Sequence, residues 1–322
     1  MRRTTVTFVS LLVLVVSAGV AYAIFTKQAT VGSNSFSTAA DWVAPTTSAS
    51  VIAKTAGGTV GYIHQGSTYY VYASVTDTGN PASGVSTVTA NVSSITTGQT
   101  AASLTAGSYT IGGVTYSYRS ASLTANAALS AGSYTYSITA TDAAGNAATT
   151  NTWSVTVDNT APAASDVQTT NKAGGTNGKA EQGDTLILTY TETMDPNSIL
   201  AGWTGASTNV VVRLNDGGVI GNDTVTIYNS ANTSQLPLGT VDMGSTTYTS
   251  ANVTFGASGT ASTMVMSGAT ITIALGHVTG TDGTALLAGT MQWTPSASAT
   301  DPAGNACSTA AKSESGASDK DF

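Results

Sequence analysis

Strict alternation of apolar and polar side chains over residues 133–141 is the feature that most limits the folds open to this chain. Tyr134, Tyr136, Ile138 and Ala140 alternate there with Thr and Ser. Successive side chains of a β-strand point to opposite faces, so this period of two residues predicts a strand with one buried face. A helix would instead need apolar residues at every third or fourth position.

The same alternation recurs between turn-forming segments. It predicts further strands over residues 69–76, 85–92, 114–123, 153–157, 183–192, 210–214, 224–228, 253–255 and 270–275. Gly, Asn, Asp and Pro supply the turns between them, as in Asp77-Thr78-Gly79-Asn80-Pro81. Short strands at this spacing predict β-sandwiches, and 322 residues are enough for two of them.

Composition supports an all-β chain and excludes one class of partner. Charged residues make up 8% of the sequence, against about 25% in a typical soluble protein. Thr, Ser, Gly and Asn replace them, and these residues are poor helix formers. The net charge is −7 and no Lys or Arg cluster occurs, so nucleic acid is not an expected partner. Cys307 is the only cysteine, which excludes an intrachain disulfide.

The first 23 residues have the pattern of an export signal. Arg2 and Arg3 precede an apolar stretch over residues 6–20, and small residues stand at Ala21 and Ala23. This pattern predicts a signal peptide over residues 1–23 that is cleaved before Ile24. The alternative is an uncleaved anchor, because residues 4–26 carry no charge and could cross about 30 Å of hydrocarbon as a helix. If the segment is uncleaved, the protein contacts the membrane only through it.

The residues around the cleavage site carry a more specific signal. The stretch Ala21-Tyr22-Ala23-Ile24-Phe25-Thr26, followed by Asn34, Phe36 and Ser37, resembles the signal region of the TasA and camelysin group of bacterial biofilm fibre subunits. The resemblance covers about the first forty residues. It implies a dedicated signal peptidase and a destination in the cell wall or matrix, and it transfers no fold to the rest.

A second resemblance concerns the folded part. Ala131-Gly132-Ser133-Tyr134, followed by Asp142-Ala143-Ala144-Gly145-Asn146 and by Asp158-Asn159-Thr160-Ala161-Pro162, is similar to the last strands and the interdomain junction of bacterial immunoglobulin-like (Ig-like) repeats. The resemblance implies a sandwich in which the Tyr134 hydroxyl bonds nearby backbone. Asp301-Pro302-Ala303-Gly304-Asn305 repeats the Asp-x-Ala-Gly-Asn hairpin, which predicts a second sandwich.

A second type of bacterial Ig-like domain has a strand that ends in an acidic residue and is followed by Met-Asp-Pro. This chain resembles that type at Glu192 and Met194-Asp195-Pro196. There Asp195 is the expected N-cap of a single helical turn, with Pro196 at its first position. The predicted organisation has five parts: a signal peptide over residues 1–23, a linker over 24–50, Ig-like sandwiches over 51–160 and 161–309, and a disordered tail over 310–322.

Catalytic chemistry has little support in the sequence. His64 and His277 fall in different predicted domains, and neither lies beside a nucleophile motif. Glu192 and Asp195 could form an acid/base pair, but the resemblance places them at a strand end and a helix cap. We therefore expect no enzymatic activity, with a secreted hydrolase as the remote alternative.

Calcium is the only cofactor that the sequence suggests. Five aspartates lie beside turns or at the predicted junction: Asp77, Asp142, Asp158, Asp184 and Asp301. Oxygen-rich loops of this kind suit this hard cation. The candidate ligands are Asp158 and Asn159 at the junction, with Asp77 or Asp184 from adjacent loops. The alternative is that these residues serve turn geometry alone.

The predicted function is that of an extracellular or cell-surface structural or adhesive protein. Its expected partners are components of the cell envelope or matrix. The alternative is a surface module that binds a glycan or a protein, for which Trp203 is the candidate contact because aromatic rings stack on sugars. Trp203 could instead belong to the core or cover the end of a sandwich.

Overall fold

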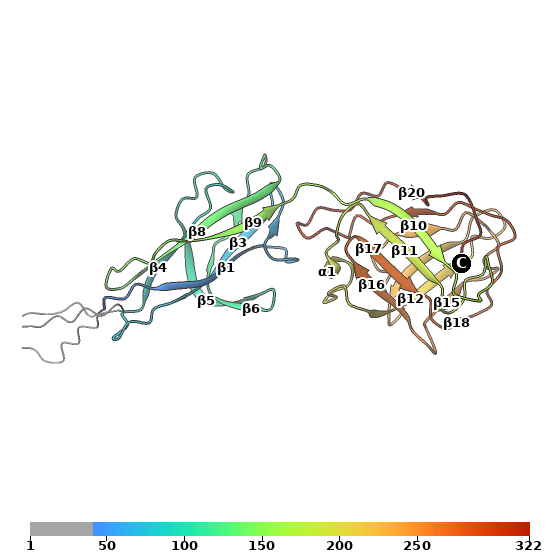
Figure 1. Ribbon diagram of the computed structural model, residues 1–322, viewed down its shortest axis with the longest axis horizontal. Helices are drawn as coiled ribbons and strands as arrows, with labels where there is room; N and C mark the ends of the chain where they lie inside the picture. The colour runs from blue at the N-terminus through green and yellow to red at the C-terminus, as the bar shows by residue number, and fades with distance from the viewer. Residues whose placement is uncertain (1–40) are drawn as a thin grey trace, which may run out of the picture.

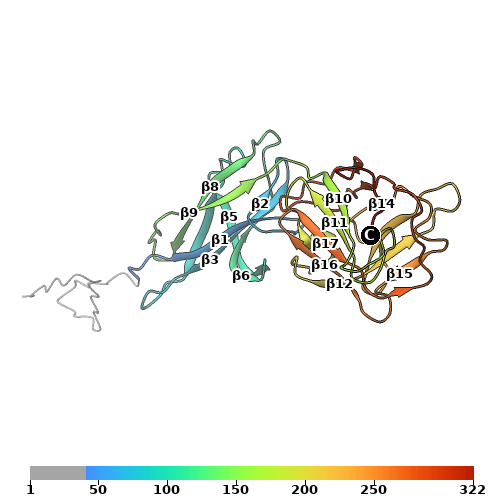
Figure 2. The same cartoon turned by 45° about the vertical axis from the view of Figure 1, so that its right-hand side comes forward.

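The computed structural model describes residues 41–322 as two β-sandwiches in line, joined by one short connection (Figures 1 and 2). The predicted signal peptide, with Ala21, Ala23 and Ile24, lies outside the described residues, as does most of the predicted linker. Among the residues that are described, no helix is long and apolar enough to cross a membrane.

Nine strands build the first domain. They are β1 (Thr46–Lys54), β2 (Tyr62–Ile63), β3 (Thr68–Thr76), β4 (Val85–Asn91), β5 (Ala102–Ile111), β6 (Val114–Ser120), β7 (Leu123–Thr124), β8 (Gly132–Asp142) and β9 (Asn151–Val157). Their order is β1-β3-β6-β5-β4-β8-β9-β2, with β7 beside β3. Strand β5 joins the two layers, because Ala102 pairs with β4 whereas Leu104 pairs with β6.

The second domain contains eleven strands and one helical turn. They are β10 (Ala164–Thr170), β11 (Thr185–Tyr190), α1 (Pro196–Ile199), β12 (Thr208–Asn215), β13 (Thr224–Asn229), β14 (Thr240–Asp242), β15 (Val253–Phe255), β16 (Ser262–Ser267), β17 (Thr270–Ala274), β18 (Val278–Thr279), β19 (Gln292–Thr294) and β20 (Lys312–Ser313). Their order is β10-β11-β17-β16-β12-β13-β14-β19-β20, and β15 pairs with both β12 and β18.

Each domain has its own hydrophobic core. The main cluster of buried apolar side chains in the first domain lies between Ile52 and Val157, and a smaller one contains Ala53, Tyr72 and Tyr116. The cluster of the second domain lies between Val167 and Phe322. The alternation seen in the sequence accounts for both, since Tyr136, Ile138 and Ala140 of β8 are buried while the residues between them are partly exposed. The prediction of an all-β chain of sandwich domains is confirmed.

Strand direction decides which ends of the domains meet. In the β1–β3 pair, Thr46 lies opposite Thr76 and Lys54 lies opposite Tyr69. The Lys54 end points toward the second domain, so the turn after Thr76 lies at the opposite pole. In the same way, the β10–β11 pair places Ala164 and Tyr190 at the junction.

Two predicted boundaries differ from the structure. Residues 46–50, assigned to a linker, form the first half of β1. The tail over residues 310–322, predicted to be disordered, packs on the second domain: β20 pairs with β19, and the side chain of Phe322 is buried beside Tyr248. Both segments are rich in small polar residues, and long-range pairing orders them.

Candidate metal centre

Each domain carries three carboxylates at the pole that faces the N-terminus of the chain. One oxygen from each member of a group lies within 4.8 Å of the others. Two of the groups are Asp41, Asp77 and Asp142 in the first domain, and Asp158, Glu192 and Asp301 at the near end of the second. A third such group, Glu314, Asp319 and Asp321, lies in the C-terminal segment. The second group lies at the junction between the domains.

The Asp-x-Ala-Gly-Asn hairpin organises the junction group. The side-chain amide of Asn305 donates to Asp301 Oδ2 at 2.8 Å and to the backbone oxygen of Asp158 at 2.9 Å. Asp158 Oδ1 in turn accepts from the backbone N–H of Thr160 at 3.0 Å. The Asp301–Asn305 hairpin, near the end of the second domain, therefore holds the connection that leads into β10, the first strand of that domain.

The first domain repeats this construction. The side-chain amide of Asn146 donates to Asp142 Oδ2 at 2.7 Å and to the backbone oxygen of Asp41 at 3.1 Å. Asp41 Oδ1 accepts from the backbone N–H of Val43 at 2.9 Å. Asp41 was missed in the predicted linker, although Asp-Trp-Val-Ala-Pro at residues 41–45 echoes Asp-Asn-Thr-Ala-Pro at residues 158–162.

The carboxylates of the first domain are well supplied with hydrogen-bond donors. Asp41 Oδ2 accepts from the backbone N–H and the hydroxyl of Ser83 at 2.8 and 3.0 Å. Asp77 Oδ2 accepts from the backbone N–H of Gly84 at 2.7 Å. The N–H groups of Val43 and Ser83 hold the pKa of Asp41 below its ordinary value. These bonds already stabilise the charged form, so this group has little need of a cation.

The junction group differs from the first-domain group at one carboxylate oxygen, that of Glu192. Glu192 Oε1 is buried and has no hydrogen-bond partner among the described residues. Burial, and then the charges of Asp158 and Asp301, raise the pKa of Glu192 to about 7. A buried, unpartnered carboxylate oxygen beside two other carboxylates fits a divalent cation, because Ca²⁺ takes oxygen ligands and favours their charged form.

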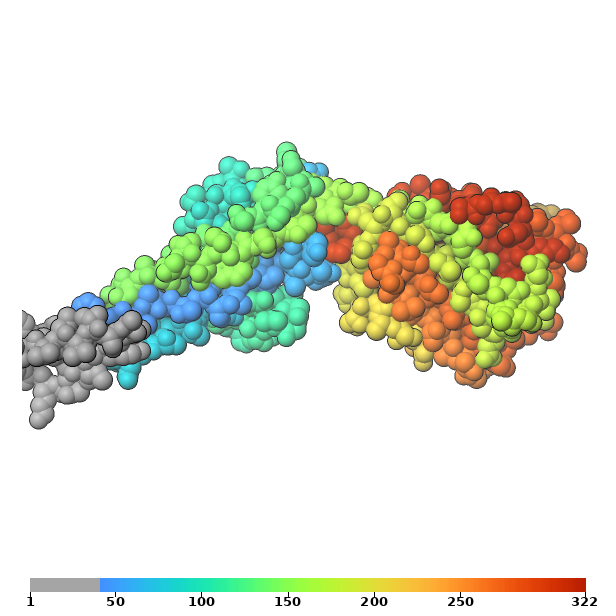
Figure 3. Space-filling model, in the orientation of Figure 1, coloured from blue at the N-terminus to red at the C-terminus, as the bar shows by residue number. Residues whose placement is uncertain are grey.

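The blue segment of the first domain lies against the second domain in Figure 3. Lys54, the last residue of β1, reaches the second domain there. Its ammonium group donates to the backbone oxygen of Pro302, and burial lowers its pKa although Asp195 and Asp301 favour its charged form. In the same contact, the backbone N–H of Thr59 donates to Asp195 Oδ2 at 3.2 Å. The loop after β1 is thereby fixed to the second domain.

Of the predicted calcium ligands, the structure places only Asp158 in the junction group. Asn159 lies next to it, but Asn159 Oδ1 accepts from the N–H of Gln65 at 2.8 Å and its amide donates to the oxygen of Leu129 at 2.7 Å. Its side chain is therefore used to anchor the connection to the first domain. Asp77 lies at the far end of β3, whose nine residues span about 30 Å, so its predicted contribution to the junction is wrong.

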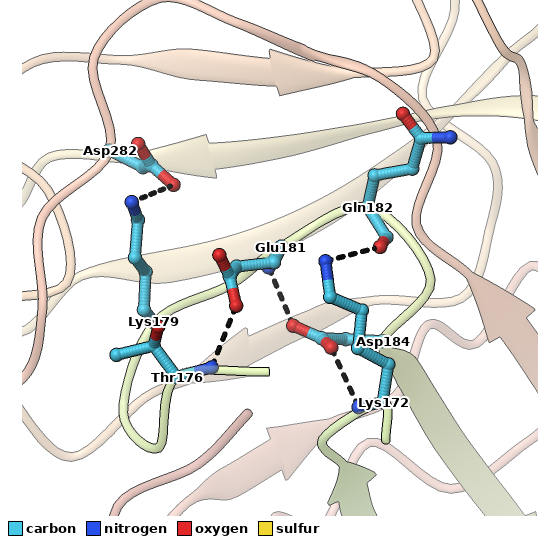
Figure 4. Close-up of polar contacts among 7 residues, drawn as sticks. All are labelled: Lys172, Thr176, Lys179, Glu181, Gln182, Asp184 and Asp282. Atoms are coloured by element: carbon cyan, nitrogen blue, oxygen red, sulfur yellow. Dashed lines mark hydrogen bonds and ion pairs between the residues drawn. The ribbon is translucent and has the colours of Figure 1, made fainter. Parts of the chain in front are cut away.

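Asp184 lies at the far end of the second domain. Its Oδ1 accepts from the backbone N–H of Lys172 at 2.9 Å and its Oδ2 accepts from that of Glu181, whose own carboxylate binds the N–H of Thr176 (Figure 4). Asp184 therefore closes a loop at the start of β11, and its predicted role at the junction is also wrong. Turn geometry explains this residue.

Trp203 belongs to the core of the second domain. Its side chain is 7% exposed, and the indole N–H donates to the backbone oxygen of Ala206. The core alternative therefore describes it, and the suggested ligand contact is wrong. Trp42, by contrast, is 74% exposed.

The reactive groups considered above occupy structural positions. Asp195 caps α1 by accepting from the N–H of Asn197 at 3.1 Å, as predicted. Tyr134 donates to the backbone oxygen of Ser130 at 3.0 Å, as its resemblance implied. Burial raises the pKa of the Cys307 thiol to about 11, which suppresses the reactive thiolate.

The first domain is similar to a known family of domains. Residues 63–159 match the family model of a bacterial Ig-like domain, which covers most of the first domain. No curated protein and no solved structure matched the chain. The first domain is thus similar to modules that are commonly found outside the cell or on its surface, and whose fold is typically non-catalytic.

Proposed function

We propose that this chain is a non-enzymatic structural or adhesive protein of the cell surface or extracellular matrix, in which two Ig-like domains form a stiff spacer. The observation that carries the proposal is the junction itself. Lys54 and Thr59 donate hydrogen bonds to the second domain, and the side-chain amide of Asn305 donates to the backbone oxygen of Asp158. Contacts from both sides oppose bending between the domains.

We further propose that calcium completes this junction, with Asp158, Glu192 and Asp301 as its protein ligands. The support is the unpartnered Glu192 Oε1 and the separation of at most 4.8 Å between one oxygen of each carboxylate. When bound, the ion supplies positive charge that keeps all three carboxylates ionised and cross-links the connection, β11 and the final hairpin. The first-domain group is not included, because neighbouring N–H and hydroxyl groups already donate hydrogen bonds to its carboxylates.

The spacer role is tested on the whole protein by small-angle X-ray scattering with calcium and with a chelator. The expected result is an elongated particle with a single maximum dimension in calcium, and a broader distribution of distances after chelation. Asp77→Asn serves as a control at the other pole. A distribution that is equally broad in both conditions would contradict a stiffened junction.

The surface location requires a separate experiment. On intact cells of the producing bacterium, added protease should remove the protein while a cytoplasmic marker survives. A deletion strain should show weaker cell–cell adhesion or a weaker matrix, restored by the intact gene. Protection from protease would contradict a surface role and leave the junction experiment unaffected.

A further inference from the structure

Arg119 of β6 lies between two tyrosine rings on the outer face of the first domain. Its Cζ atom is 4.4 Å from the ring centre of Tyr70 and 4.5 Å from that of Tyr109. These side chains come from three strands, β6, β3 and β5, and all three are half-buried. A guanidinium held over two aromatic faces has little freedom to turn.

A layer of tyrosines beneath fixes this arrangement. The ring of Tyr72 is buried, and its centre lies 6.1 Å from that of Tyr70, 6.4 Å from that of Tyr109 and 5.8 Å from that of Tyr116. Edge-to-face and tilted contacts at these distances are favourable for aromatic pairs. The β5–β6 hairpin thereby packs on the outer face of β3 as well as pairing with it, and the position of the guanidinium is set before any ligand arrives.

The donors of Arg119 are free. Within residues 41–322 its guanidinium forms neither a hydrogen bond nor a salt bridge, and the only salt bridge in that part of the chain joins Lys179 to Asp282. Arg213 also stacks on a tyrosine, but its Nε and Nη2 donate to Asn232 Oδ1 and to the Asn232 backbone oxygen, both at 2.9 Å. Arg213 therefore has hydrogen-bond partners within its own domain, whereas Arg119 presents its N–H groups to solvent.

We propose that Arg119, with Tyr70 and Tyr109, forms a binding site for the carboxylate of an acidic polysaccharide. The planar fork of a guanidinium matches the two oxygens of a carboxylate, and its stacked faces leave the in-plane N–H groups as the available donors. The site is a local positive charge with no carboxylate partner in a chain whose net charge is −7, so its complement is an anion from another molecule.

The surroundings favour a sugar acid over an acidic peptide. Thr105 lies opposite Arg119 on β5 and is exposed. Its hydroxyl can bond a hydroxyl of a sugar ring, while the tyrosine edges offer apolar contact to the C–H groups of the ring. This inference deepens the proposed surface role by naming a ligand class, and binding can be measured wherever the protein resides.

Isothermal titration calorimetry of the whole protein tests the site. The probes are tetramers of galacturonate and mannuronate and the glucuronate-containing tetrasaccharide of hyaluronan, with a neutral galactose tetramer and tetraglutamate for comparison. At least one uronate should bind, and the neutral tetramer should not. Arg119→Gln should weaken binding about tenfold or more, as expected for a lost hydrogen bond to a charged group. Arg213→Gln is the matched control and should leave the affinity unchanged.

Each other outcome overturns the proposal. Failure of all three uronates to bind at millimolar concentration excludes the ligand class. If Arg119→Gln binds the uronate as tightly as the wild type does, the ligand binds elsewhere on the protein. If tetraglutamate binds more tightly than the uronates, the partner is an acidic peptide. If Arg119→Gln does not fold, Arg119→Lys is tested instead, because it keeps the positive charge but lacks the planar guanidinium. It should bind the uronate several-fold more weakly than the wild type does. Equal affinity of that variant would likewise contradict the site.

Discussion

The side-chain amide of Asn305 donates to the backbone oxygen of Asp158 across 2.9 Å, although 147 positions separate them in the sequence. Asn305 belongs to the last hairpin of the second domain, and Asp158 follows the last strand of the first. The same amide also donates to the carboxylate of Asp301, so one side chain joins the interdomain connection to the final hairpin.

Calcium is expected to raise the melting temperature, and the gain should depend on Glu192. An ion that binds only the folded state stabilises it by RT ln(1 + [L]/Kd), which is about 2.7 kcal/mol at one hundred times Kd. Glu192→Gln and Asp158→Ala should each abolish most of this gain in differential scanning calorimetry. Asp77→Asn, at the other acidic pole, should retain it. A melting temperature that is the same in calcium and in chelator would show that the junction carboxylates serve only as hydrogen-bond acceptors.

Removal of residues 311–322 should destabilise the second domain. The fragment 161–310 loses β20 and the buried side chain of Phe322, whereas 161–322 keeps both. Burial of one phenylalanine side chain contributes about 1.5–3 kcal/mol. Urea unfolding of the two fragments should therefore differ by at least this amount, and Phe322→Ala in the longer one should reproduce much of the loss. Equal stabilities would show that the segment is not bound in solution.

Asp321 should make the protein less stable as the pH rises toward neutrality. Burial, and then the charge of Glu314, raise the pKa of Asp321 to about 7. The folded state therefore keeps a proton that the unfolded state releases near pH 4, so the free energy of unfolding falls between about pH 4 and pH 7 and levels off above.

Asp321→Asn keeps an acceptor for the Thr169 hydroxyl, which lies 3.1 Å from Asp321 Oδ1, and removes the charge. Urea unfolding in chelator at pH 5, 6, 7 and 8 should show a smaller decline for this variant than for the wild type. Parallel curves would contradict the raised pKa.

Trp203→Ala should act on stability. Its side chain is buried in the core, and truncation of a buried tryptophan costs about 3–5 kcal/mol. Trp42→Ala, at a side chain that is 74% exposed, should change the unfolding free energy by no more than about 0.5 kcal/mol. A folded Trp203→Ala variant of wild-type stability would show that the side chain is not packed as the structure has it.

The local features of this protein could be predicted from its amino-acid sequence alone. The sequence pattern identified β8 and nine of the other nineteen strands, and Asp195-Pro196 identified the cap of α1, because each depends only on residues adjacent in the chain. The repeated Asp-x-Ala-Gly-Asn hairpin pointed to two similar domains for the same reason.

Which acidic residues meet depends on how the strands pair and pack, and the sequence did not predict it. Asp77, Asp158 and Asp184 all follow or precede turns, yet antiparallel pairing carries Asp77 and Asp184 to poles remote from the junction and brings Glu192 and Asp301 to Asp158. The free guanidinium of Arg119 likewise depends on Tyr70 and Tyr109, which belong to two other strands. Side-chain periodicity is a property of one strand, whereas direction and register belong to pairs of strands, and the energy that selects them comes from burying a whole face at once.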